Sequence, residues 1–260
     1  MTATNRRGAS TRYSAGEWQA RVDLAAAYRL VELHDMHDVI YTHISARVPD
    51  EDGAFLINPF GLWFHEITAS SLVKVDIDGN VLDDSLGMGI NYAGYVIHSA
   101  IHAERHDVDC VLHTHTKAGV ALSCLKEGLL PLNQWALQFH GKIAYHDYEA
   151  IAFDLDERAR LVGDLGDKPV MILRNHGLLT AGRSVAEAWK MMFNLERSCE
   201  AQLALNATAA ELVYPPESVC EKTAGQYWEI YDAIDAGEKP DREWAAFLRL
   251  LDDKAPGYKD

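Results

Sequence analysis

Two short apolar runs that lead into histidines constrain this chain more than any other feature. Residues 109–114 and 169–173 have the pattern of buried strands, and they run into His113-Thr114-His115 and Asn175-His176-Gly177. Alternate residues of a strand point to the same side, so His113 and His115 can reach one ion. The turn after the second run could supply His176 as a third ligand.

Three imidazoles with open coordination positions are typical of a catalytic rather than a closed structural metal site. A His-x-His on a strand also occurs as two ordinary polar residues, and a chain with 12 histidines gives more chances for that. Both segments nevertheless lie at strand ends, where active sites tend to sit. We expect one divalent ion per subunit, and ligand type alone does not choose between Zn, Mn and Fe.

Composition excludes several classes of partner. A formal net charge of −15 leaves nothing to neutralise the phosphates of a nucleic acid or an anionic membrane surface. No apolar run approaches the length of a membrane span. The start of the chain lacks the apolar stretch of a signal peptide. The cysteines show no pairing pattern or C-x-x-C spacing, which favours a reduced, cytoplasmic protein; they are Cys110, Cys124, Cys199 and Cys220.

The periodicity predicts a mobile tail over residues 1–15, one domain over 16–214 and a helical extension over 215–260. The extension could pack on a neighbouring subunit or on the chain's own core. Helical patterns occur at 16–36, 92–105, 116–124, 156–165, 184–206, 217–237 and 241–251. Strand patterns occur at 39–48, 54–58, 71–76, 80–82, 109–114, 141–146 and 169–173. Their irregular alternation predicts an α/β fold with a mixed or antiparallel sheet and helices on its faces.

Several motifs together give the chain a resemblance to the class II aldolase/adducin family. The resemblance covers about residues 20–215. Its motifs are His113-Thr114-His115 with Thr116-Lys117-Ala118-Gly119, Arg174-Asn175-His176-Gly177-Leu178 and Asn58-Pro59-Phe60-Gly61-Leu62. The stretches 145–148 and 68–74 are similar to the adducin head domain in particular. The resemblance implies a single three-layer α/β/α domain, a three-histidine metal site, and a homotetramer with active sites between subunits.

The departures from the family pattern are informative. The sugar-phosphate aldolases that the chain resembles have a Ser-Ser-Glu-like stretch, whose carboxylate acts as acid and base. This chain has Tyr92-Ala93-Gly94 there, and Thr42 and His43 replace a glycine and an asparagine that hold phosphate. Phosphate needs hydroxyl and backbone N–H donors. A phosphorylated sugar is therefore not the expected substrate.

A metal held by neutral imidazoles can stabilise negative charge on an enolate oxygen. We therefore expect a metal-dependent carbon–carbon lyase, of aldolase or decarboxylase type, that acts on a non-phosphorylated carbonyl compound or aromatic acid. One alternative is an Fe(II) oxygenase on the same fold. Another is a non-catalytic adducin-like binding or assembly module, although this chain shows no basic, lysine-rich tail before Asp260.

The expected reaction also needs proton-transferring and substrate-binding groups. The catalytic candidates are His140, Tyr145 and His43, with His98 and His146 considered beside them. The substrate-binding candidates are Asn58, Phe60, Gly61, Tyr92, Lys117 and Arg174, with Arg47 and Glu66 as further possibilities. Each of these also has an ordinary structural reading, as a turn residue, a packed ring or a solvated charge. Small-molecule substrates are the only partners expected apart from other subunits.

Overall fold

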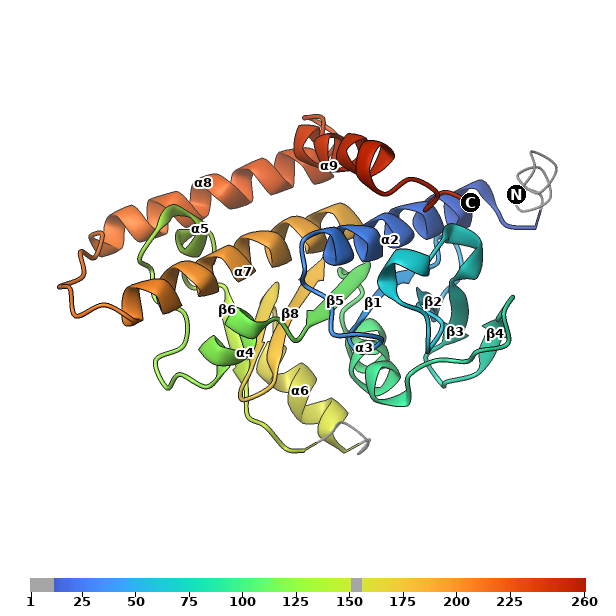
Figure 1. Cartoon of the computed structure of the whole chain (residues 1–260), viewed down its shortest axis with the longest axis horizontal. Helices are drawn as coiled ribbons and strands as arrows, with labels where there is room; N and C mark the ends of the chain where they lie inside the picture. The colour runs from blue at the N-terminus through green and yellow to red at the C-terminus, as the bar shows by residue number, and fades with distance from the viewer. Residues whose placement is uncertain (1–11, 151–155) are drawn as a thin grey trace.

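A computed structural model describes residues 12–150 and 156–260 of the chain (Figure 1). Most of the expected mobile tail, residues 1–11, lies outside the described residues. Tyr13 donates a hydrogen bond to Asp83 (Oη–Oδ2 2.8 Å), and Ser14 caps the first described helix by accepting from the backbone N–H of Glu17 at 3.0 Å. The chain is therefore anchored to the sheet edge from just before this helix onward.

Eight strands form one sheet in the order β4-β3-β2-β1-β5-β8-β7-β6. Their bounds are β1 His43–Arg47, β2 Ala54–Ile57, β3 Val73–Asp76, β4 Val81–Asp83, β5 Cys110–Thr114, β6 Ile143–His146, β7 Val170–Leu173 and β8 Gly177–Gly182. Neighbouring strands run antiparallel except β6 and β7, which are parallel. The expected mixed sheet is confirmed.

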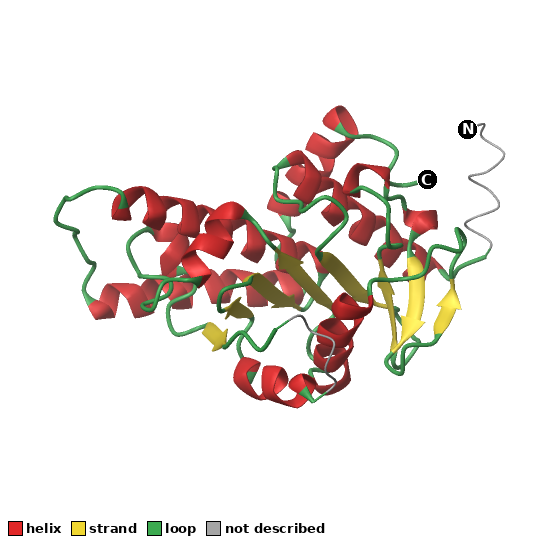
Figure 2. Cartoon of the chain, turned by 60° about the horizontal axis from the view of Figure 1, so that its bottom comes forward, coloured by secondary structure: helices red, strands yellow, loops and turns green. Residues whose placement is uncertain are grey.

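Helices cover both faces of this sheet, which gives the expected three layers (Figure 2). Their bounds are α2 Ala15–Leu33, α3 Tyr92–Glu104, α4 Lys117–Ser123, α5 Gln134–Leu137, α6 Glu157–Leu165, α7 Val185–Asn206, α8 Glu217–Asp235 and α9 Arg242–Lys254, with short 3₁₀ turns η1 Phe64–Glu66 and η2 Ala69–Ser71. Alternation along the strands separates two cores. Leu112 of β5 packs with α2 and α7, whereas its neighbour Val111 packs with α3 and α6.

Two strand predictions need correction. The strand expected over 39–48 begins only at His43, because Val39 and Thr42 have φ angles of +55° and +68°, which a strand cannot accommodate. The second error is an omission: β8 follows His176 directly and pairs with both β5 and β7. The turn expected at 174–177 is therefore a tight connection between β7 and β8, with Asn175 in the left-handed region at φ +55°.

The C-terminal extension packs on the chain's own core. Helix α8 runs beside α7 (Figure 1), and Tyr231 and Leu251 of α8 and α9 are buried in the larger core cluster. The backbone N–H of Ala69 donates to the carbonyl of Tyr258 at 2.9 Å, which ties the last turn to η2. Among the described helices, none is apolar over a length that could cross a membrane. All four cysteines are free thiols.

Candidate metal centre

Three histidines converge where β5 ends and β7 turns into β8. His113 is the fourth residue of β5, His115 follows the strand's end, and His176 lies in the tight turn. Nε2 of His115 is 2.9 Å from Nε2 of His113 and 2.9 Å from Nε2 of His176. The sheet brings the two segments together because β5 and β8 pair in register, with His113 opposite Leu179.

Hydrogen bonds on the far side of two rings fix which nitrogen carries the proton. Nδ1 of His113 lies 2.9 Å from the carbonyl oxygen of Leu178, and Nδ1 of His115 lies 2.9 Å from Oδ2 of Asp38. Carbonyl and carboxylate oxygens only accept, so both Nδ1 atoms must donate. The two Nε2 atoms then carry lone pairs, and they face each other without a proton to share.

This arrangement fits a divalent cation. Lone pairs 2.9 Å apart repel one another unless a positive charge lies between them. A zinc-like ion bound at about 2.0–2.1 Å would hold tetrahedral nitrogen ligands roughly 3.3 Å apart. The rings therefore need to move by only a few tenths of an ångström. Asp38 also supplies the carboxylate–histidine contact that commonly orients a metal ligand.

The electrostatics keep two of these rings, those of His113 and His176, neutral, as metal ligation requires. Burial, followed by the neighbouring rings of His115 and His176, lowers the pKa of His113 well below its ordinary value. Burial and the charge of His115 lower the pKa of His176 to about 4. Both imidazoles are therefore neutral at pH 7, and each has one nitrogen with a lone pair available to a cation.

His43, a predicted catalytic residue, lies beside this trio. Its strand β1 pairs with β5 so that His43 is opposite His113, and the two rings stack with centroids 5.6 Å apart. The ring also lies directly over Gly94 of α3. A Cβ built at Gly94 would come within 2.3 Å of Cδ2 and 2.4 Å of Nε2 of His43. The departures from the family pattern at positions 43 and 94 are therefore sterically coupled. The ring of His43 occupies the space that a side chain at position 94 would need.

A chain of buried side chains supports His43 from behind. Its Nδ1 lies 3.4 Å from Nε2 of His98, and Nδ1 of His98 lies 2.7 Å from Oγ of Ser45. The same hydroxyl lies 2.7 Å from Nε2 of His102. Burial lowers the pKa values of His98 and His102 to about 3, so both imidazoles are neutral. His98 therefore acts as a structural support of His43.

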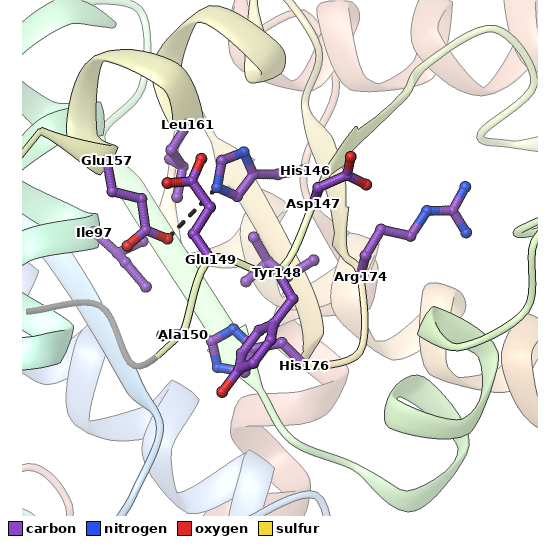
Figure 3. Close-up of a pocket in the computed structure, with 11 residues that line it drawn as sticks. Ile97, His146, Asp147, Tyr148, Glu149, Ala150, Glu157, Leu161, Arg174 and His176 are labelled. Carbon is purple, nitrogen blue, oxygen red and sulfur yellow. Dashed lines mark ion pairs between the residues drawn. The ribbon is translucent and has the colours of Figure 1, made fainter. Parts of the chain in front are cut away.

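A pocket opens next to His176 (Figure 3). The ring of Tyr148 lies over His176, with centroids 6.1 Å apart. Deeper in the pocket, His146 is buried between two carboxylates, with Nδ1 2.7 Å from Asp164 and Nε2 3.5 Å from Glu157. Asp147 and Glu149 also line this pocket, together with Arg174, so its described walls carry charges of both signs with more carboxylates than cations.

Three predicted site residues point elsewhere within this subunit. Arg174 extends away from His176 in Figure 3 and donates to the carbonyls of Leu125 (2.6 Å) and Lys126 (3.3 Å). Tyr145 packs with the α7 side of the sheet, opposite the face of His43, and its hydroxyl accepts from the N–H of Leu129 at 3.2 Å. His140 pairs with Glu217 of α8 at 2.9 Å.

The remaining predicted residues have other surroundings. Asn58 is buried, with Oδ1 2.9 Å from the hydroxyl of Tyr28. Phe60 packs against Tyr41, and Gly61 lies next to Met88. The side chains of Tyr92 and Lys117 are exposed at the first residues of α3 and α4.

Two further residues considered from the sequence have structural contacts. Nε of Arg47 donates to the carbonyl of Val108 at 2.8 Å, and Glu66 accepts from the N–H of Trp63 at 2.8 Å. Sequence reasoning missed Asp38 and Tyr148, which lie in the site. Tyr148 lies in the Tyr-His-Asp-Tyr stretch at 145–148, whose resemblance to the adducin head domain could have indicated it. Nothing local distinguishes Asp38 from other acidic loop residues.

Comparisons with known proteins agree with this fold. Residues 22–203 match the family model described as Class II Aldolase and Adducin N-terminal domain. The crystal structure of an aldolase II superfamily protein from Pseudomonas syringae is 56% identical, with a TM-score of 0.89 over 96% of this chain and 98% of that one. L-fuculose 1-phosphate aldolase from Glaciozyma antarctica PI12 is 28% identical, with a TM-score of 0.74 over 86% and 92% of the two chains. Alpha-adducin of Rattus norvegicus is 47% identical over 96% of this chain and 35% of its own length.

Proposed function

Since the chain belongs to the family of class II aldolase and adducin N-terminal domains, we propose that it is a divalent-metal-dependent lyase that cleaves a carbon–carbon bond. The observation that supports this proposal most directly is the convergence of three Nε2 atoms, two of them with the proton held on the opposite nitrogen. Such a set would hold the ion through His113, His115 and His176.

The ion would supply electrostatic stabilisation of negative charge on a substrate oxygen, as an enolate requires. The residues of the chain have separate roles. Asp38 holds the orientation of His115, and the carbonyl of Leu178 holds that of His113. His43 lies next to the trio with its Nε2 beside Gly94, where it can hydrogen-bond a substrate oxygen. Tyr148 covers His176 and would line the substrate cavity.

We propose a non-phosphorylated carbonyl compound as the substrate class. Two observations support this choice. The ring of His43 fills the space next to Gly94, in the region where the resembling aldolases bind phosphate. The described pocket walls carry three carboxylates, Asp147, Glu149 and Glu157, against the single guanidinium of Arg174, which points away from His176, and this excess of negative charge would disfavour a phosphate dianion. A single carboxylate would be repelled less, so an aromatic acid stays in the test panel.

The roles of the other predicted site residues remain proposals, and the structure supports some of them better than others. Phe60 and Tyr92 would line an apolar part of the cavity, and Lys117 is the exposed cation closest in sequence to the trio. Asn58, Gly61, Arg174, His140 and Tyr145 have other contacts in this subunit, so they are weaker candidates for the site. We also propose a cytoplasmic homotetramer, and light scattering of the purified protein tests its mass.

Metal analysis of the purified protein tests the site. Wild-type protein should carry about one ion in the trio, and His113→Ala and His176→Ala should each lose it. His106→Ala is the matched control, because His106 is an exposed histidine on a loop away from the trio. A wild-type protein that binds no divalent ion at the trio would contradict the proposal.

Turnover tests the reaction. Release of an aldehyde or carbon dioxide should be followed over a panel of hydroxy-carbonyl compounds, aromatic acids and a sugar phosphate. Activity should be lost in His113→Ala and should proceed without dioxygen. Turnover that consumes dioxygen would instead identify an oxygenase.

A second candidate function is a binding or assembly module, because alpha-adducin is 47% identical to this chain. A folded protein with the metal bound and no turnover on the whole panel would favour this alternative. The two functions make the same prediction for the fold and differ only in chemistry.

A further inference from the structure

A second cluster of metal-ligating side chains lies on the α8 side of the molecule. It joins His140, which follows α5, to Glu217 and Cys220 in the first turn of α8. One ligand atom from each residue lies within 4.8 Å of the other two. Nε2 of His140 is 2.9 Å from Oε1 of Glu217. None of these residues belongs to the trio.

The spacing of Glu217 and Cys220 suits a common ligand. Residues three apart on a helix lie on the same face, one turn above the other. Their donors are a carboxylate oxygen and a sulfur, and His140 adds an imidazole nitrogen. This combination of donors is typical of zinc, whose bonds of about 2.0–2.3 Å place tetrahedral ligands roughly 3.3–3.7 Å apart. The His140–Glu217 separation of 2.9 Å lies a few tenths of an ångström below that range, and the separations from Cys220 are no more than 4.8 Å.

Burial distinguishes this cluster from an ordinary surface ion pair. Cys220 is 1% exposed, and within the described part of the chain its thiol makes one hydrogen-bond contact, a long one of 3.7 Å to the carbonyl of Pro215. The side chain of Glu217 is 72% exposed. The cluster therefore has a closed side that holds the sulfur and an open side through which an ion can enter. A water molecule could complete four-coordination there.

Charge also favours a divalent ion. A carboxylate and a thiolate together carry two negative charges, which balance the charge of Zn²⁺. The N-terminus of α8 carries partial positive charge and would oppose a cation by itself. Binding therefore depends on both anionic ligands. Loss of Glu217 or Cys220 should abolish the site rather than weaken it slightly.

We propose that His140, Glu217 and Cys220 form a second Zn²⁺ site, separate from the trio. The ion would tie the first turn of α8 to the core. Two hydrogen bonds already tie later turns of α8 to the core. Nε2 of Gln138 donates to the hydroxyl of Tyr231 at 2.9 Å, and Nε1 of Trp228 donates to the carbonyl of Gln138 at 3.2 Å. The proposal does not depend on the lyase function.

Cobalt spectroscopy separates the two sites, because the trio contains no sulfur. Wild-type protein loaded with Co²⁺ should bind about two ions and show a thiolate-to-cobalt charge-transfer band. Cys220→Ser should bind about one ion and lose the band, whereas His176→Ala should bind about one ion and keep it. His140→Ala should lose the band as Cys220→Ser does.

Cys124→Ser is the matched control, because Cys124 is an exposed thiol outside the cluster. It should leave both the band and the stoichiometry unchanged. Absence of the band from folded wild-type protein would overturn the proposal, and so would a band that persists in Cys220→Ser or His140→Ala. If the trio does not bind metal, wild-type protein and His176→Ala would bind the same number of Co²⁺ ions, and this result is separate from the presence of the thiolate band.

Discussion

Replacement of Gly94 by alanine tests whether the ring of His43 occupies the space beside position 94. The added Cβ would lie 2.3 Å from Cδ2 of His43, whereas ordinary contacts begin at 3.4 Å. One of the two must move by about 1 Å. The ring has little room, because it is buried, stacks against His113 and lies 3.4 Å from His98.

The expected loss of stability follows from two opposing effects. Overpacking a closed site costs about 1–3 kcal/mol, and the short contact puts this case near the upper end. Alanine gains about 1 kcal/mol over glycine inside a helix. Gly94→Ala should therefore reduce the free energy of unfolding by roughly 2 kcal/mol. Urea unfolding of the metal-free protein measures it.

Two controls make the result specific. Gly163→Ala lies in α6 with nothing within 4 Å of the added Cβ, so it should be neutral or stabilising. In a His43→Ala background the clashing ring is gone, so Gly94→Ala should cost about 3 kcal/mol less than in wild type and leave the gain of about 1 kcal/mol from helix propensity. The reasoning fails if Gly94→Ala behaves like Gly163→Ala, or if its cost is the same in both backgrounds.

Three further changes probe the surroundings of the site. Asp38→Asn should lower zinc affinity at the trio by about 10- to 100-fold, because His115 loses its orienting carboxylate; competition with a chelator measures this, and unchanged affinity would count against it. Arg174→Ala should cost about 1–3 kcal/mol in urea unfolding, with metal content unaltered, because two carbonyls lose a charged donor; a stable variant with lower metal content would reverse that interpretation. Burial holds the pKa of His98 at about 3, below its ordinary 6.5, so the unfolded chain takes up this proton first and stability is lost as pH falls from 6.5 towards 3. His98→Gln should reduce the slope of unfolding free energy against pH in that window, and His102, whose pKa is also about 3, should keep part of it. An unchanged slope would exclude a contribution from His98.

The pairing of His113 with His115 could be predicted from the sequence because its geometry is local, whereas His176 was added through the motifs shared with the family. His113 and His115 are two residues apart at the end of an apolar strand, and strand periodicity alone places them on one side. The central strands and the long helices could be predicted for the same reason. The strand predictions were wrong where a single φ angle or a short connection sets the strand's bounds. Examples are Thr42, which keeps β1 from starting earlier, and β8, which follows His176 directly.

The other site residues required the tertiary structure. His140 and Tyr145 have plausible positions in the sequence, yet one pairs with α8 and the other packs on the opposite face of the sheet. Conversely, Asp38 reaches His115 across a long sequence separation and has no local signature.

The sequence by itself therefore determined the fold class, the candidate histidine trio and the substitution at Gly94, because backbone periodicity and residue type are properties of short segments. Only the packing of β1 against β5 and α3 showed that His43 occupies the space beside that glycine. Contacts of this kind depend on how distant elements fill a shared volume, and that volume exists only once the layers have closed.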